Sequence, residues 1–166
     1  MSKTEHNLKS AFAGESQANR KYLAFSKKAE QEGYKRAAKM FRAAAAAETV
    51  HAHSHLRELN GIRSTRENLQ EAISGESYEF QSMYPGMIDA ARAEGKTGAL
   101  RSFEYANVVE QIHAELYKKI LDRLEQDKDK DANFHVCQVC GYTVEGNAPD
   151  ECPVCKAKKP AFSKVE

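Results

Sequence analysis

The sequence lacks any long hydrophobic run and any strong excess of charge of one sign. No stretch approaches the roughly 20 apolar residues of a membrane-spanning helix, so we expect no transmembrane segment. The 25 Lys and Arg residues are balanced by 24 Asp and Glu residues, which gives no reason to expect binding to nucleic acid or an anionic membrane. The first ten residues are polar and contain no apolar stretch of the secretory type, so we expect a cytoplasmic protein.

Cysteine is also scarce, and all four cysteines lie within one short segment. They form two Cys-x-x-Cys pairs, Cys137 with Cys140 and Cys152 with Cys155. Disulfides that tie distant parts of the chain together are therefore excluded. Two tight pairs in a cytoplasmic protein indicate a metal site.

The chain changes character near residue 126. Long helical patterns rich in Ala, Glu, Lys, Arg and Leu come before this point. A charge run over residues 127–131 and a short segment containing Cys, Pro and Gly come after it. We therefore predict a helical domain over residues 1–126, a solvated linker over 127–132 and a small metal-binding domain over 133–166.

Apolar residues recur at helical spacing in four long stretches. The predicted helices cover residues 4–32, 34–59, 75–93 and 97–125, with a short helix over 68–73 in the central connection. Ser64 or Thr65 can cap that short helix, and Pro85 predicts a kink in the third long helix. Tight turns join the first helix to the second and the third to the fourth. We therefore expect two antiparallel pairs and a four-helix bundle with one crossover.

A glutamate interrupts the apolar face of each long helix. The four residues are Glu15, Glu48, Glu76 and Glu110. Burying one unpaired carboxylate costs several kcal/mol, so four would rival the roughly 5–15 kcal/mol net stability of a domain. No Lys or Arg occupies a matching position on these faces. A metal cluster is the simplest source of compensating positive charge.

Two of these glutamates begin a Glu-x-x-His motif. His51 follows Glu48, and His113 follows Glu110, at a spacing that puts both side chains on one helical face. A single such motif, or a single glutamate on an apolar face, is common without a metal. Together, one Glu from each of two helices and one Glu-x-x-His from each of the other two match the ligand set of di-iron carboxylate bundles. Ligands of this kind suit iron or manganese better than tetrahedral zinc.

The two cysteine pairs are typical of metal-binding knuckles. Each turn directs two thiolates toward one point, so two turns build a tetrahedral site with four sulfur ligands. By itself the motif leaves zinc and iron open, and a structural zinc ribbon is the simpler reading. A redox-active carboxylate cluster in the same chain favours iron, because the cluster needs a supply of electrons.

The combination resembles the rubrerythrin family over essentially the whole chain. The segments that carry the resemblance are AFAGESQA at residues 11–18, ETVH at 48–51, GESYE at 75–79, MYP at 83–85, EQIH at 110–113, CQVCGY at 137–142 and CPVC at 152–155. The implied fold is a ferritin-like four-helix bundle followed by a small rubredoxin-like domain of strands and loops. Lys156 follows the last knuckle, where independent rubredoxins usually have Gly.

The resemblance implies a binuclear non-haem iron site with an oxo or hydroxo bridge, and a mononuclear iron bound by four cysteines. Glu48 and Glu110 would bridge the two irons, Glu15 would be terminal on one iron, and Glu76 and His113 would be terminal on the other. Glu79 is an additional carboxylate, which an iron exchanges for His51 on reduction. Tyr22 and Tyr84 match family tyrosines near the cluster, although the sequence alone favours ordinary packing for both.

The implied activity is the reduction of hydrogen peroxide to water. Electrons would come from rubredoxin or from an NAD(P)H-dependent reductase and would pass through the cysteine-bound iron. Because the charged linker is expected to extend outward, we predict a head-to-tail homodimer in which electrons cross between chains. Two other functions are a ferritin-type ferroxidase and a zinc-ribbon adaptor with a merely structural bundle.

Overall fold

The computed structural model describes residues 2–128 and 130–166 of the chain. Met1 and Asp129, which fall in the predicted first domain and linker, lie outside the described residues. The contacts divide the chain into two compact units, Met1–Arg63 and Ser64–Glu166, and each is described by itself. Among the described residues, no helix is both long enough and apolar enough to cross a membrane.

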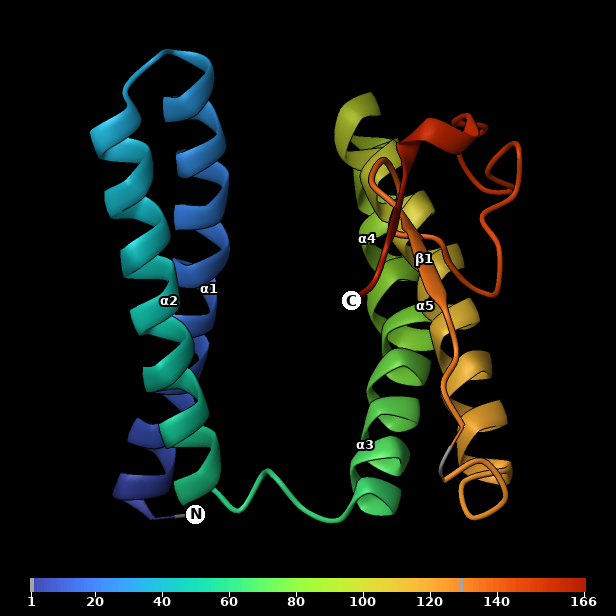
Figure 1. Ribbon diagram of the computed structural model, residues 1–166, viewed down its shortest axis with the longest axis horizontal. Helices are drawn as coiled ribbons and strands as arrows, with labels where there is room; N and C mark the ends of the chain where they lie inside the picture. The colour runs from blue at the N-terminus through green and yellow to red at the C-terminus, as the bar shows by residue number, and fades with distance from the viewer. Residues whose placement is uncertain (1, 129) are drawn as a thin grey trace. The chain divides into compact units, whose positions relative to one another are not determined.

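The first unit is a helical hairpin made of α1 (Lys3–Gln31) and α2 (Lys35–Glu58), which lie side by side in Figure 1. Ser2 caps α1 by accepting a hydrogen bond from the Glu5 backbone N–H at 3.1 Å, and the Glu5 carboxylate accepts from the Ser2 N–H in return. Gly33, with a φ of 85°, makes the turn between the helices.

Small side chains line the interface between α1 and α2. The buried residues of α2 are Ala38, Ala45 and Ala52, spaced seven apart, and those of α1 are Ser26 and Ala29. A seven-residue spacing keeps these alanines on one side of the helix. The absence of bulk at these positions lets the two backbones approach closely.

The second unit begins with α3 (Thr65–Tyr78), which packs against α5 (Thr97–Asp122). Ser64 caps α3 through a capping box with Glu67, as predicted for Ser64. The separate short helix predicted over residues 68–73 is wrong, because α3 continues through Gly75 without a break. A glycine inside a helix costs only about 1 kcal/mol, and the cap and the packing against α5 oppose that cost.

The kink expected at Pro85 takes the form of a π-helical turn, η1 (Glu79–Met83), directly before α4 (Tyr84–Ala93). The Tyr84 N–H donates to the Glu79 carbonyl, five residues back, so the helix is locally wider. Pro85 then lies in the first turn of α4, where its missing N–H does no harm.

The C-terminal module is a three-stranded antiparallel sheet in the order β2-β1-β3. Its strands are β1 (Phe134–Cys137), β2 (Thr143–Glu145) and β3 (Phe162–Lys164), and a short 3₁₀ turn, η2 (Lys159–Ala161), leads into β3. The predicted class, mainly helical with a small C-terminal domain of strands and loops, is confirmed.

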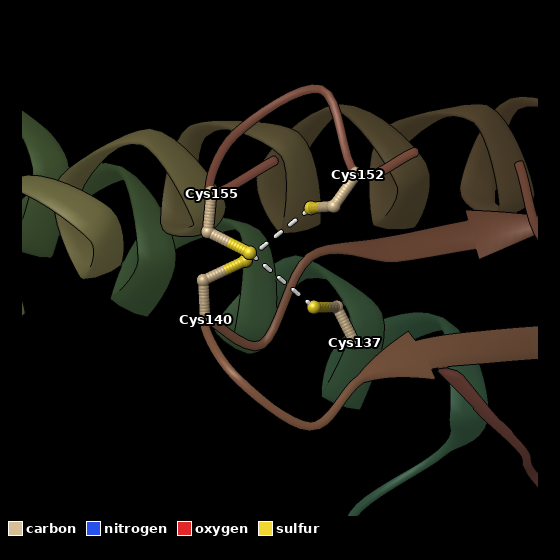
Figure 2. A group of neighbouring side chains, drawn as sticks. All are labelled: Cys137, Cys140, Cys152 and Cys155. Carbon is tan, nitrogen blue, oxygen red and sulfur yellow. Dashed lines mark hydrogen bonds between the residues drawn. The ribbon is translucent and has the colours of Figure 1, made fainter. Parts of the chain in front are cut away.

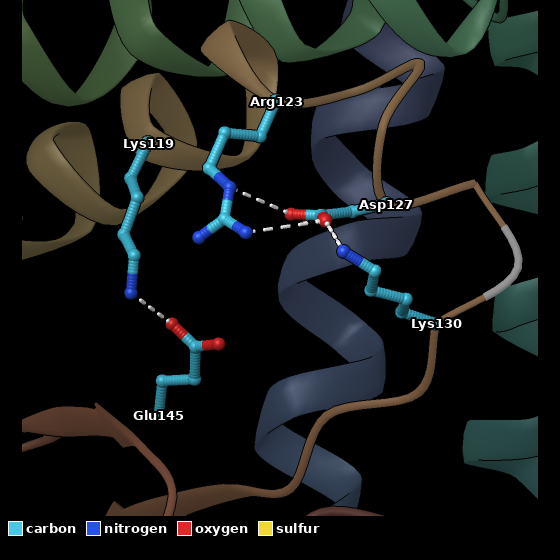
Figure 3. Close-up of polar contacts among 5 residues, drawn as sticks. All are labelled: Lys119, Arg123, Asp127, Lys130 and Glu145. Carbon is cyan, nitrogen blue, oxygen red and sulfur yellow. Dashed lines mark hydrogen bonds and ion pairs between the residues drawn. The ribbon is translucent and has the colours of Figure 1, made fainter.

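The segment between α5 and β1 does not extend outward, so that expectation is wrong. Asp127 forms ion pairs with Arg123 at 3.1 Å and Lys130 at 2.7 Å, which gather the charges into a local turn (Figure 3). The chain then returns along α5, where Lys119 donates to the Glu145 carboxylate. Charges of opposite sign pair locally here, and the module lies beside its own α5 (Figure 1).

We predict that Ala38→Leu destabilises the hairpin by about 1–3 kcal/mol, because Ala38 is completely buried and a larger side chain would force α1 and α2 apart. Chemical denaturation monitored by circular dichroism measures the loss. Ala46→Leu, at an exposed position of the same helix, is the matched control and should change stability by less than about 0.5 kcal/mol. Equal effects of the two substitutions would contradict the alanine-lined interface.

Candidate metal centres

The four cysteine sulfurs converge on one point, as Figure 2 shows. Cys137 and Cys155 have their Sγ atoms 3.6 Å apart, as do Cys140 and Cys152. These separations are far longer than a disulfide bond of about 2.05 Å. They are close to the edge of about 3.8 Å of a sulfur tetrahedron around a metal with 2.3 Å bonds. The predicted tetrathiolate site is therefore assembled in the fold.

Each knuckle turns on a residue with positive φ. The Gly141 N–H donates to the Cys137 carbonyl at 2.9 Å, and the Lys156 N–H donates to the Cys152 carbonyl at 3.0 Å. Gly141 has a φ of 85° and Lys156 has a φ of 64°. Lysine in place of glycine therefore keeps the left-handed turn, at a cost of about 1–2 kcal/mol.

Backbone N–H groups of the knuckles favour the thiolate forms. Burial acts to raise the pKa of Cys137, but N–H groups of Val139 and Cys140 bring that pKa below its usual value. Burial keeps the pKa values of Cys140 and Cys155 above their usual value. A bound cation would favour the thiolate forms of Cys140 and Cys155 at neutral pH.

The first unit contributes a carboxylate and imidazole group from α1 and α2. Glu15, Glu48 and His51 each offer one ligand atom within 4.8 Å of the others. The Nδ1 atom of His51 lies 3.0 Å from the Glu48 carboxylate, as the Glu-x-x-His spacing predicts. The Glu48 side chain is only 18% exposed, so its charge lies partly out of water.

The second unit contributes the matching group from α3 and α5. Glu76, Glu110 and His113 also lie within 4.8 Å of one another. The Nδ1 atom of His113 is 2.8 Å from Glu110 and 3.8 Å from Glu76. Its other nitrogen, Nε2, is 2.9 Å from the Thr143 hydroxyl of β2. Sequence reasoning missed Thr143, because 30 residues separate it from His113 and only the docking of the module brings them together.

Burial and neighbouring carboxylates raise pKa values in and beside the group formed by Glu76, Glu110 and His113. Burial, followed by the neighbouring Glu110 carboxylate, raises the pKa of Glu76 and of Glu79 above the usual glutamate value. Burial and the charge of Glu79 raise the pKa of the Tyr84 hydroxyl. Glu79 and Tyr84 thus lie in the field of the second group, at the two ends of the π-helical turn. A cation bound there would reverse these shifts.

Tyr22 lies in the first unit among other aromatic rings. Its ring centroid is 6.3 Å from that of Phe25 and 6.2 Å from that of Phe41. These contacts agree with the packing role that the sequence alone favours. A role for Tyr22 at the metal cluster remains a prediction.

The donor sets fit the metals that the sequence predicts. Each helical group offers two carboxylates and one imidazole, a hard oxygen-rich set that suits iron, and the cysteine group offers four sulfurs. The two helical groups belong to different units, so the bridging and terminal roles of their individual glutamates stay predictions.

Comparison with known proteins identifies both parts of the chain. The family model described as "Rubrerythrin" matches residues 6–121, and that described as "Rubrerythrin, rubredoxin-like domain" matches residues 135–163. Nigerythrin of Nitratidesulfovibrio vulgaris is 36% identical over 174 residues, which cover 96% of this chain and 85% of the relative. Rubrerythrin-2 of Clostridium acetobutylicum is 34% identical, over 93% of this chain and 92% of the relative.

Solved structures of nigerythrin also match this chain. Nigerythrin in a mixed-valence state and nigerythrin in a fully reduced, all-ferrous state each show a TM-score of 0.59 and 34% identity, covering 99% of this chain and 88% of theirs. The Glu and His groups of the helices are thus those of a di-iron site, and the four cysteines are those of a rubredoxin-like iron site.

We predict that Glu76→Gln stabilises the metal-free protein at pH 7. A glutamate whose pKa is raised in the folded state favours folding at low pH, and this contribution is lost as the pH rises through the folded-state pKa. The amide mimics the protonated acid, so the gain should shrink as the pH falls toward the usual glutamate value of 4.5. Denaturant unfolding at several pH values measures both effects.

Glu115→Gln is the matched control, since Glu115 is an exposed residue of α5 outside the metal group. It should leave stability nearly unchanged across the same pH range. A Glu76→Gln protein that is less stable than the native chain at pH 7 would contradict the proposed crowding of charge.

Proposed function

Because the chain belongs to the rubrerythrin family, we propose that it is a peroxidase that reduces hydrogen peroxide to water in oxidative-stress defence. The observation that carries this proposal is the presence, in one chain, of both Glu/His groups and a tetrathiolate site. When bound, two ferrous ions supply the two electrons needed to split the O–O bond, and the tetrathiolate iron returns electrons one at a time. The residues of the chain bind the metals, position the substrate, and donate or accept protons.

In this proposal the four core glutamates share the binding of two irons. Glu48 and Glu110 would bind both metals, each carboxylate lying beside its own histidine. Glu15 would bind one of the two irons only, and Glu76 and His113 would bind the other.

Glu79 and His51 are proposed to alternate as ligands of one iron. Glu79 is the first residue of the π-helical turn. Its carbonyl accepts a hydrogen bond from the N–H five residues ahead, where a regular α-helix would use the N–H four residues ahead. Its raised pKa makes it a carboxylate that accepts a proton readily when it is not bound to metal. His51 is 56% exposed, which leaves its ring room to turn.

Tyr84 is proposed to donate a hydrogen bond near the cluster. Its raised pKa keeps the hydroxyl protonated, so it can donate to a carboxylate or to a peroxide oxygen. Tyr22 is assigned the same role from the first unit on the family resemblance. Catalytic assignments to Glu79, His51, Tyr22 and Tyr84 all belong to this proposal.

The electron donor is proposed to be rubredoxin or an NAD(P)H-dependent reductase. A cytoplasmic location and a head-to-tail homodimer remain predictions of the same kind. A ferritin-type ferroxidase is the main alternative, and both Glu79 and the cysteine module argue against it. Reaction of the fully reduced protein with peroxide and with dioxygen separates the two, since a peroxidase reacts rapidly with peroxide and slowly with dioxygen.

We predict that Cys137→Ala stops steady-state peroxide reduction with an external donor, because the tetrathiolate iron can no longer form. The chemically reduced helical site of this variant should still consume one peroxide per site. Stopped-flow absorbance measures the single turnover. Val139→Ala, at an exposed position in the same knuckle, is the control and should keep full turnover. Loss of the single turnover in an otherwise intact variant would contradict the division of work between the two sites.

We further predict that His51→Ala leaves the oxidised site assembled but slows peroxide reduction at least about tenfold. Glu79 should serve as the ligand in the oxidised state, whereas the reduced state needs His51. His53→Ala, at an exposed position outside the Glu/His group, is the control. Crystal structures of both oxidation states of the native chain test the idea directly, and an iron bound by Glu79 in both states would rule it out.

A further inference from the structure

The ligands of the di-iron site are divided equally between two parts of the chain. Each part offers two glutamates and one histidine: Glu15, Glu48 and His51 in the α1–α2 hairpin, and Glu76, Glu110 and His113 in the unit that follows. Neither set alone supplies the four carboxylates and two imidazoles of a di-iron carboxylate bundle. A complete site therefore requires one hairpin and one second unit, and these can come from one chain or from two.

The segment between α2 and α3 is the observation that separates these two origins. Six residues separate the end of α2 from the start of α3. The first of them stay wound on the end of α2, where the Gly61 N–H donates to the Leu56 carbonyl at 2.9 Å and Asn60 adopts a φ of 54°. The four steps from Gly61 to Thr65 then reach no more than about 14 Å, even when the chain is fully extended.

A ferritin-like bundle needs a much longer connection at this point. In that fold one long crossover returns the chain along the bundle, so the helices on either side of the crossover run in the same direction. The 24 residues of α2 form a helix about 36 Å long. A connection that reaches about 14 Å cannot return along it. Short connections instead place consecutive helices antiparallel, which is not the ferritin-like order.

We propose that the chain forms a dimer by exchange of hairpins, in which α1 and α2 of one copy dock on α3, α4 and α5 of a second copy. The second copy brings its own orientation, so the short connection no longer has to return along the bundle. Each dimer then contains two complete four-helix bundles, and each di-iron site is built from two chains. This inference rests on the shared metal site of the proposed function but not on its peroxide chemistry.

The apolar side chains of the helices support the exchange, because neither part fills its core from within. The buried apolar residues of the helices are all small, and in the described part of the chain they are Ala29, Ala38, Ala45, Ala52, Ala91, Val109 and Ala114. Larger side chains stay partly in water, with Phe25 of the hairpin 48% exposed and Met87 of α4 39% exposed. Docking of a further pair of helices would remove such side chains from water.

Mixed dimers test which chain supplies each half of the site. A Glu48→Ala chain and a Glu110→Ala chain, carrying different tags, are co-expressed and purified through both tags. With exchanged hairpins, one site of the mixed dimer combines a native hairpin with a native second unit, whereas the other site carries both substitutions. We expect the mixed dimer to bind about half of the native di-iron content. Each variant alone should bind none, because every site in it lacks a shared carboxylate.

The reciprocal pair is the matched control. A chain that carries both substitutions is co-expressed with the native chain under the same two tags. Exchange places one substitution in each site, so this mixed dimer should bind almost no iron in its helices. Without exchange, the native chain would keep its own site, and the iron contents of the two mixed dimers would be reversed. Reversed or equal contents would overturn the proposal.

Iron in the helices is counted as total iron minus the iron of the tetrathiolate, which is measured by its absorbance. Glu48→Gln paired with Glu110→Gln keeps the size of both side chains and repeats the test if the alanine chains do not fold. Light scattering of the native protein should give twice the 18.6 kDa mass of the chain. A monomer that holds a complete di-iron site, or co-expression that yields no mixed species, would also overturn the proposal. A dimer with exchanged hairpins that does not reduce peroxide would refute only the peroxidase proposal.

Discussion

Carboxylates turned away from water require a cation, and most features of the site follow from this requirement. Burial, followed by the charge of Glu110, raises the pKa values of Glu76 and Glu79 above the usual glutamate value. Without metal, their charge opposes folding at neutral pH. When a metal is bound, the same closely spaced carboxylates serve as its ligands. The stability of the helical part and its capacity to bind iron are therefore two results of one electrostatic arrangement.

The two histidines have different surroundings. Each Glu-x-x-His motif brings an imidazole Nδ1 against its own glutamate. His113 has its second nitrogen satisfied by Thr143, whereas His51 is more than half exposed. This difference agrees with the proposed functions, in which His113 stays bound and His51 alternates with Glu79. A histidine held at both nitrogens, as His113 is, has a fixed ring orientation.

The C-terminal module depends on backbone geometry more than on a hydrophobic core. Cys137 and Cys152 are its most deeply buried side chains, so the metal site itself takes the place of a core. Lys156 accepts a left-handed conformation to preserve the second knuckle. The pairing of Asp127 with Arg123 and Lys130 turns the connecting segment back toward α5. Together these contacts place the four-cysteine site beside α5, the helix that carries Glu110 and His113.

The sequence by itself determined the identity of the metal groups. Periodicity of 3.6 residues placed Glu48 with His51 and Glu110 with His113, and the knuckle spacing placed the four sulfurs, because these relations are local along the chain. Only tertiary structure decided the rest. The continuity of α3 through Gly75 depends on packing against α5, and the contact of Thr143 with His113 joins segments that are distant along the chain. Contacts of this kind cannot be predicted from local sequence patterns, because a hydrogen bond between residues 30 positions apart leaves no periodicity in the sequence.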